Sequence, residues 1–197
     1  MLSVLYMESA DALAHIIRFY CPDAPVLLDV THGTGTMTKK CPIPVVGVDI
    51  DPNSKAEIIA DSTSLPLPDS SFDAAVFDPP YLYGSHAMHM GPIGKKTWAA
   101  ERTTWKKPQD LISFSAGIGA ELSRVLRPGG KAIVKIMNSR LKGDLIRNDQ
   151  IITDAFGAYN LKLQDQVVYV RTVTGSFPNP KSAQMAHGFW LIFKRVV

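Results

Sequence analysis

A short apolar run that stops at an acid and two prolines is the feature that most constrains the fold of this chain. Residues 74–77 are apolar, and Asp78, Pro79, Pro80 and Tyr81 follow them directly. Such a run, bounded by breakers, predicts a buried strand. The strand must end at Asp78, because proline has no N–H to give to a sheet. Asp78 is therefore expected at the carboxyl end of a strand, the edge at which open α/β sheets bind ligands.

The chemical groups of this turn suit an aromatic amine. Asp78 offers carboxylate oxygens and Pro79 offers a carbonyl, so the two form a cluster of acceptors without a competing donor. An exocyclic amino group on a base has two N–H bonds and needs two acceptors. Tyr81 supplies a flat face on which a ring can stack. The alternative interpretation is a strand-terminating turn with a solvated acid.

Upstream, a second apolar run leads into a loop with two glycines. Residues 26–30 predict a strand with Asp29 near its end, and Gly33 and Gly35 lie in the Thr-His-Gly-Thr-Gly-Thr segment of residues 31–36. A strand followed by a glycine turn and a helix start is the layout of a nucleotide-binding crossover. The third glycine of the dinucleotide pattern is missing, which favours an uncharged group such as a nucleoside over a pyrophosphate. A plain turn is the alternative.

Two further strands are expected to end in acids. Residues 45–49 predict a strand that ends at Asp49, the place where a ribose would be bound after a first-strand glycine loop. Residues 58–60 predict a short strand followed by Asp61 and Ser62. Asp61 could accept from an adenine amino group and the Ser62 N–H could reach a ring nitrogen, although a turn-forming aspartate explains the same pattern.

The remaining elements follow from apolar periodicity and from breakers. A helix of one or two turns is expected between Gly35 and Pro42. The longer elements are listed by residue number: helices at 8–20, 109–126 and 144–159, and strands at 131–137, 161–170 and 188–196. The last two strands are expected to pair antiparallel at one edge of the sheet.

Two polar segments interrupt this pattern. Residues 82–108 carry lysines interleaved with tryptophans beside the Asp78 turn, which favours a substrate loop over a nucleic-acid strand. An ordinary surface loop is the alternative. His86 and His89 lack further ligands nearby, so no metal site is predicted. Residues 171–187 form a second polar loop whose charges could meet phosphates or water.

The composition sets broad limits. A length of 197 residues predicts one domain, and the net charge of +3 is compatible with a nucleic-acid partner. Cys21 and Cys41 form no metal-binding or disulfide pattern. The sequence contains no run of about 20 apolar residues and no secretory leader, so we expect no membrane span and a cytoplasmic location.

Taken together, these motifs resemble a known family. Residues 29–36, 46–51, 61–62 and 78–81, in this order, resemble class I S-adenosylmethionine-dependent methyltransferases, and within them the DPPY-type amino-methyltransferases of DNA and RNA. Residues 126–130 resemble the turn before the fifth strand of that family. The resemblance covers nearly the whole chain. It implies an α/β, Rossmann-like fold: a seven-stranded, mostly parallel sheet with one antiparallel strand and helices on both faces.

The resemblance also assigns roles to residues. For S-adenosylmethionine it implies a binding set made of Asp29, Thr31, His32, Gly33, Gly35, Asp49, Ile50, Asp61 and Ser62. Within this set, Asp29 would lie near the amino group of the methionine part, Asp49 would bind the ribose, and Asp61 with Ser62 would hold the adenine. The catalytic set is Asp78, Pro79, Pro80 and Tyr81, in which Asp78 and the Pro79 carbonyl would bind the target amine and Tyr81 would stack on a flipped base.

The implied activity is methyl transfer to adenine N6 or cytosine N4 in DNA. We expect no separate recognition domain, so recognition would depend on the loops at 82–108 and 171–187, on a partner protein or on a homodimer. Three alternatives stay open. They are methylation of guanine N2 or adenine N6 in tRNA or rRNA, methylation of a small molecule, and a non-catalytic role in a larger methylating complex.

Overall fold

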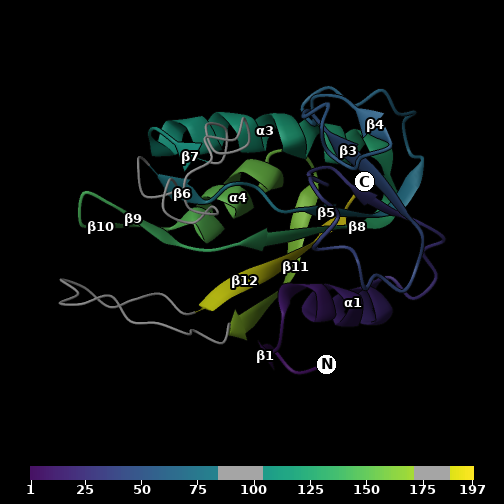
Figure 1. Cartoon of the computed structure of the whole chain (residues 1–197), viewed down its shortest axis with the longest axis horizontal. Helices are drawn as coiled ribbons and strands as arrows, with labels where there is room; N and C mark the ends of the chain where they lie inside the picture. The colour runs from purple at the N-terminus through teal and green to yellow at the C-terminus, as the bar shows by residue number, and fades with distance from the viewer. Residues whose placement is uncertain (84–103, 171–186) are drawn as a thin grey trace.

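The computed structural model describes residues 1–83, 104–170 and 187–197, and it shows one large sheet between layers of helix (Figure 1). The sheet has eight strands. Their order across the sheet is β1 (Val4–Tyr6), β11 (Leu161–Val170), β12 (His187–Arg195), β8 (Leu126–Ile136), β5 (Phe72–Phe77), β2 (Leu27–Asp29), β3 (Val45–Asp49) and β4 (Ile58–Ile59). β12 is antiparallel to both of its neighbours, and every other neighbouring pair is parallel. The fold is therefore the expected mostly parallel α/β sheet with one antiparallel strand.

The expected strand count of seven is wrong. The additional strand is β1, which pairs in parallel with β11 through the partners Val4 and Val168. Three residues are too few to show an alternating pattern, which is why the sequence did not predict this strand. β11 and β12 do pair antiparallel, as expected, but β1 covers the outer side of β11, so this pair is not at the edge of the sheet.

Helices lie on both faces of the sheet. α1 (Ser9–Tyr20) covers one face, and α3 (Pro108–Val125) and α4 (Asn148–Gly157) cover the other (Figure 1). β5 shows how one strand serves both layers. Ala74 and Val76 pack in the core under α1, whereas Ala75 and Phe77 pack in the core under α3 and α4. This alternation follows from the period of two along a strand.

Two expected helices differ in the structure. Residues 36–42 form turns, with a single backbone bond from the Cys41 N–H to the Thr38 carbonyl, so the short helix expected there is absent from this described segment. The helix expected from residue 144 begins only at Asn148. Residues 144–146 instead form β10 (Asp144–Ile146), which pairs antiparallel with β9 (Ser139–Leu141).

A two-residue turn explains the β9–β10 hairpin. Lys142 and Gly143 connect the paired residues Leu141 and Asp144, and both have positive φ, +52° and +99°. Two positive φ values in a two-residue loop match the twist of a hairpin. Lys-Gly is not one of the dipeptides that mark such a turn in a sequence. The sequence analysis therefore extended the predicted helix to residue 144 and did not predict the hairpin.

A second small sheet lies beside the hairpin. It consists of β6 (Leu82–Tyr83) and β7 (Thr104–Trp105), which begin and end the segment expected to be the substrate loop. Residues 84–103 of that segment and residues 171–186 of the second loop, expected at 171–187, lie outside the described residues, as do His86 and His89. Among the helices that the structure describes, none has the length and apolar character needed to cross a bilayer.

Candidate functional site

The site is built where four neighbouring parallel strands end. β3, β2, β5 and β8 lie side by side, and their carboxyl ends carry Asp49, Asp29, Asp78 and Lys135 respectively. Three of these side chains were predicted from the sequence. Parallel neighbours bring their carboxyl ends to one edge of a sheet, which is why residues far apart in the chain meet here.

Asp29 organises the loop that follows β2. Its side chain is 1% exposed; one carboxylate oxygen accepts from the Thr31 N–H at 3.1 Å and the other pairs with His32 Nδ1 at 3.1 Å. The hydrogen bond to Asp29 is the main cause that raises the pKa of His32; burial opposes it, and the charges of Glu57 and Asp49 add to it. The imidazole is thus held in place within the loop. Both carboxylate oxygens of Asp29 already have hydrogen-bond partners in the same loop.

The two loop glycines serve different purposes. Both have positive φ, +55° at Gly33 and +71° at Gly35. A Cβ at Gly35 would lie 2.9 Å from His32 Nε2, and one at Gly47 on β3 would lie 2.5 Å from His32 Cγ, so these two glycines make room for the imidazole. A Cβ at Gly33 would meet no atom within 4 Å. Only Gly33 therefore borders open space that a ligand could use.

Asp49 ties the glycine loop to β3. Its carboxylate accepts from the Gly33 N–H at 2.7 Å through one oxygen and from the Asp51 N–H at 2.9 Å through the other. A carboxylate has about four acceptor positions, so two of them are still available to hydroxyl donors such as those of a ribose. Beside it, Ile50 is 41% exposed, an apolar surface at the rim of the same loop.

Asp61 and Ser62 are adjacent in the turn after β4, but only one of them faces solvent. Asp61 is exposed, and its Oδ1 accepts from the Thr63 N–H at 2.8 Å and from the Thr63 hydroxyl at 2.7 Å. Ser62 is buried, and its hydroxyl donates to the Val30 carbonyl. The Ser62 side chain therefore fixes this turn to the end of β2, and the acceptor that stays accessible belongs to Asp61.

Thr31 joins the glycine loop to the Asp78 turn. The Asp78 N–H donates to the Thr31 hydroxyl at 2.9 Å, and the Thr31 N–H donates to Asp29. Because these bonds connect consecutive strand ends, the loop expected to hold the cofactor and the turn expected to hold the substrate are fixed relative to each other.

Three backbone carbonyls follow Asp78 in this turn, and two of them accept hydrogen bonds from side chains of the same chain. The Pro80 carbonyl accepts from Trp105 Nε1 at 2.7 Å, and the Tyr81 carbonyl accepts from Asn148 Nδ2 at 3.1 Å. Among the residues that the structure describes, none donates to the carbonyl of Pro79, a residue that is buried as a whole. A buried acceptor without a donor is unfavourable. The turn thus leaves one carbonyl, next to Asp78, for a donor from elsewhere.

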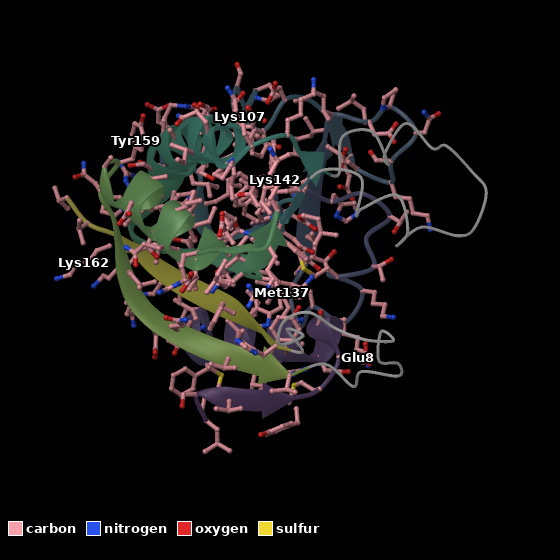
Figure 2. The ribbon with its side chains drawn as sticks, turned by 90° about the vertical axis from the view of Figure 1, so that its left-hand side faces the viewer. Glu8, Lys107, Met137, Lys142, Tyr159 and Lys162 are labelled. Carbon is pink, nitrogen blue, oxygen red and sulfur yellow. The ribbon has the colours of Figure 1, made fainter. Side chains whose placement is uncertain are left out.

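The buried side chain of Asn148 fixes the Asp78–Tyr81 turn, and the sequence analysis missed this residue. It is fully buried; Nδ2 also lies 2.8 Å from the Met137 carbonyl and 3.0 Å from the Ser139 hydroxyl oxygen, while Oδ1 accepts from the Tyr83 hydroxyl at 2.9 Å. Met137, labelled in Figure 2, directly follows β8. This network joins the Tyr81 turn to the end of β8.

Lys135 is the second residue of the candidate site that the sequence analysis missed. Its Nζ lies 3.0 Å from Asp78 Oδ2 and 3.3 Å from Oδ1, and 5.9 Å from the centre of the Tyr81 ring. The side chains of Lys135 and Asp78 are 11% and 24% exposed. A signal for it was present, because lysine is almost never buried without a partner and Lys135 interrupts the apolar run of residues 132–137.

Burial and the ion pair act in opposite directions on these two groups. Burial raises the pKa of Asp78, with a smaller contribution from Asp29, and the Lys135 ammonium offsets part of this rise. Burial lowers the pKa of Lys135, but the charge of Asp78 together with Tyr169 and Tyr81 outweighs it, so that this pKa lies above its ordinary value. Lys135 therefore carries its proton and presents a cation to Asp78.

Comparisons with known proteins place the fold. A SAM-dependent methyltransferase from Methanosarcina mazei has a TM-score of 0.58 at 16% identity, over 92% of this chain and 97% of its own. The chain has the fold of the S-adenosylmethionine-dependent methyltransferases. The 1,6-didemethyltoxoflavin-N1-methyltransferase of Burkholderia thailandensis, solved with S-adenosylhomocysteine, has a TM-score of 0.57 at 14% identity, over 96% of this chain and 79% of its own.

A third solved structure has the same fold. Geranyl diphosphate methyltransferase, solved in complex with SAM, has a TM-score of 0.57 at 13% identity, over 95% of this chain and 85% of its own. No protein-family model and no curated protein sequence matches the chain. The methyl acceptors of the structures named here differ in kind, so the shared fold leaves the acceptor of this chain to be argued from its own residues.

Proposed function

We propose that this chain transfers a methyl group from S-adenosylmethionine to an exocyclic amino group of a nucleobase, adenine N6 or cytosine N4 in DNA. The observation that carries the proposal is the pair of acceptors at the end of β5. Asp78 directly precedes Pro79, to whose carbonyl no described residue donates, whereas the next two carbonyls accept from Trp105 and Asn148.

The residues around the glycine loop fit the cofactor. When bound, S-adenosylmethionine supplies a methyl group on a positively charged sulfur. Gly33 borders open space, Asp49 retains acceptor positions for ribose hydroxyls, and Asp61 retains a carboxylate oxygen for an amine. Three other residues of the predicted set would support the cofactor site by shaping the loop. These are Thr31 through its hydroxyl, His32 through its ring and Gly35 through the space that its missing Cβ leaves for that ring. Ile50 offers apolar surface at its rim.

The acceptor pair suits the chemistry of an aromatic amine. The nitrogen lone pair of such an amine is delocalised into the ring, which makes it a poor nucleophile. Hydrogen bonds from its two N–H groups to Asp78 and to the Pro79 carbonyl favour a tetrahedral nitrogen and stabilise the positive charge that develops there. Alignment of the amine with the methyl donor provides a further part of the rate. Tyr81 offers the face on which a flipped base would stack.

Substitution of Asp78 tests this proposal. We expect Asp78→Ala to lower methyl transfer to DNA at least about 100-fold, because a group aimed at developing charge is lost. The affinity for S-adenosylmethionine, measured by calorimetry, should stay close to that of the wild-type protein. Asp23→Asn, a change of an exposed acid outside the site, is the matched control and should leave transfer unchanged. An Asp78→Ala protein that transfers methyl groups at the wild-type rate would show that the assigned role is wrong.

A further inference from the structure

The hairpin of residues 139–147 projects beyond the sheet on the side of the candidate site (Figure 1). Its strands have three residues each, so at about 3.4 Å per residue it extends about 10 Å. Its turn, Lys142 and Gly143, is exposed. Lys142 lies at the tip of the hairpin and has a positive φ, which is uncommon for a residue other than glycine.

The base of this hairpin is fixed to the Asp78–Tyr81 turn. Asn148 donates to the Tyr81 carbonyl at 3.1 Å and lies 3.0 Å from the Ser139 hydroxyl oxygen, so one buried amide joins the two. β9 also lies alongside β6, which follows Tyr81 directly. The hairpin therefore has a defined place next to the Asp78–Tyr81 turn, and β6, which pairs with β7, lies between β7 and β9 (Figure 1).

The exposed charges on both sides of β6 are mainly basic. On the hairpin, Arg140 donates to the Gly143 carbonyl at 2.8 Å, and neither it nor Lys142 forms an ion pair with any described residue. Directly after β7, Lys106 and Lys107 are exposed and likewise lack a carboxylate partner in the described part of the chain.

Three nearby acids and one more arginine reduce the positive charge of this surface but leave it basic. Asp110 accepts from the backbone N–H groups of Lys106 and Lys107, each at 3.1 Å. Arg147 is paired with Asp149 at 2.8 Å. Asp144 is the one exposed acid of the 139–147 hairpin. The surface that remains carries three exposed lysines and the partly buried Arg140, against Asp110 and Asp144, beside a site proposed to take a base.

We propose that Lys142 and Arg140 of the hairpin, together with Lys106 and Lys107, bind the backbone phosphates of the nucleic-acid strand that presents the target base. The inference rests on the proposed function, because a base within a nucleic-acid strand has backbone phosphates on both sides of its nucleotide. Cations on the two segments that flank β6 can contact phosphates on both sides of a single extruded nucleotide. Such contacts position a strand without reading its sequence.

The salt dependence of binding tests the inference. Binding of a fluorescent 12-residue single strand is measured by anisotropy over a range of salt concentrations, without S-adenosylmethionine. Each phosphate contact contributes about 0.7 to the slope of log affinity against log salt on a single strand, so the Lys107→Gln, Lys142→Gln double variant should lose about 1.4. Lys162→Gln, an exposed lysine at the start of β11, is the matched control (Figure 2). Its slope should equal that of the wild-type protein.

Three results would overturn the inference: an unchanged slope in the double variant, an equal loss in Lys162→Gln, or no binding of any strand by the wild-type protein. DNA and RNA strands of the same sequence form separate arms, and loss of slope on either one supports the inference. Because binding is measured without turnover, failure of this surface is distinct from failure of the proposed function. A protein that binds strands through these lysines yet methylates no base would contradict the proposed function alone.

Discussion

Replacing Lys135 by methionine removes the cation beside Asp78 and keeps an unbranched side chain. Removing one partner of a buried ion pair costs about 3–5 kcal/mol. Because the side chains of Lys135 and Asp78 are 11% and 24% exposed, we expect a loss near the lower limit, about 3 kcal/mol of unfolding free energy where Asp78 is ionised. Lys135→Arg retains the charge and is the control.

The loss should depend on pH, and its sign follows from proton binding. Without Lys135, burial and the charge of Asp29 raise the pKa of Asp78 further, while Tyr81 and Tyr169, the other titratable groups facing the pair, supply no cation. The folded variant then binds the Asp78 proton more tightly than the unfolded chain does. Its stability therefore falls as the pH rises from the ordinary carboxyl pKa through the raised one.

Two assays measure this effect. Urea unfolding of Lys135→Met against the wild-type protein should give a small difference in free energy at about pH 5 and a larger one at about pH 8. If catalysis needs an ionised Asp78, the acidic limb of the kcat/KM profile should move to higher pH in Lys135→Met and not in Lys135→Arg. A stability difference that is equal at both pH values, with superimposable activity profiles, would refute the reasoning.

Two further substitutions test other parts of the site. Gly33→Ala should lose about 1–2 kcal/mol of stability, because φ there is +55°, and should also weaken S-adenosylmethionine binding in calorimetry. Gly129→Ala, at φ +86° and equally open, should lose similar stability but no affinity; equal affinities in the two variants would contradict the cofactor site. Asn148→Ala should lose at least about 3 kcal/mol in urea unfolding, because several buried groups lose their partner. A loss no greater than that of the exposed Asn53→Ala would contradict this.

Local patterns in the sequence sufficed for the elements that hold the acids. β5, β2, β3 and β4 follow short apolar runs with clear breakers, and α1 and α3 follow from apolar spacing. The acids that end these strands therefore lie at one edge of the sheet, as predicted.

The features that were missed depend on contacts between distant segments. Lys135 pairs with Asp78 across 57 residues and Asn148 reaches Tyr81 across 67, and no local pattern encodes either contact. The hairpin was missed because Lys142 adopts a positive φ, which a lysine in a sequence does not predict. Likewise, the predicted role of Gly35 overlooked His32, whose ring fills the space that the glycine leaves.

The nucleosides formed on nucleic acid test the central claim most directly. Methyl-labelled S-adenosylmethionine is incubated with the wild-type protein and with duplex DNA, single-stranded DNA or RNA, and the digested nucleosides are separated. The account predicts label in N6-methyladenine or N4-methylcytosine from DNA, and its loss with Asp78→Ala. Label in no nucleoside, or only on a ring carbon or a sugar oxygen, would contradict it.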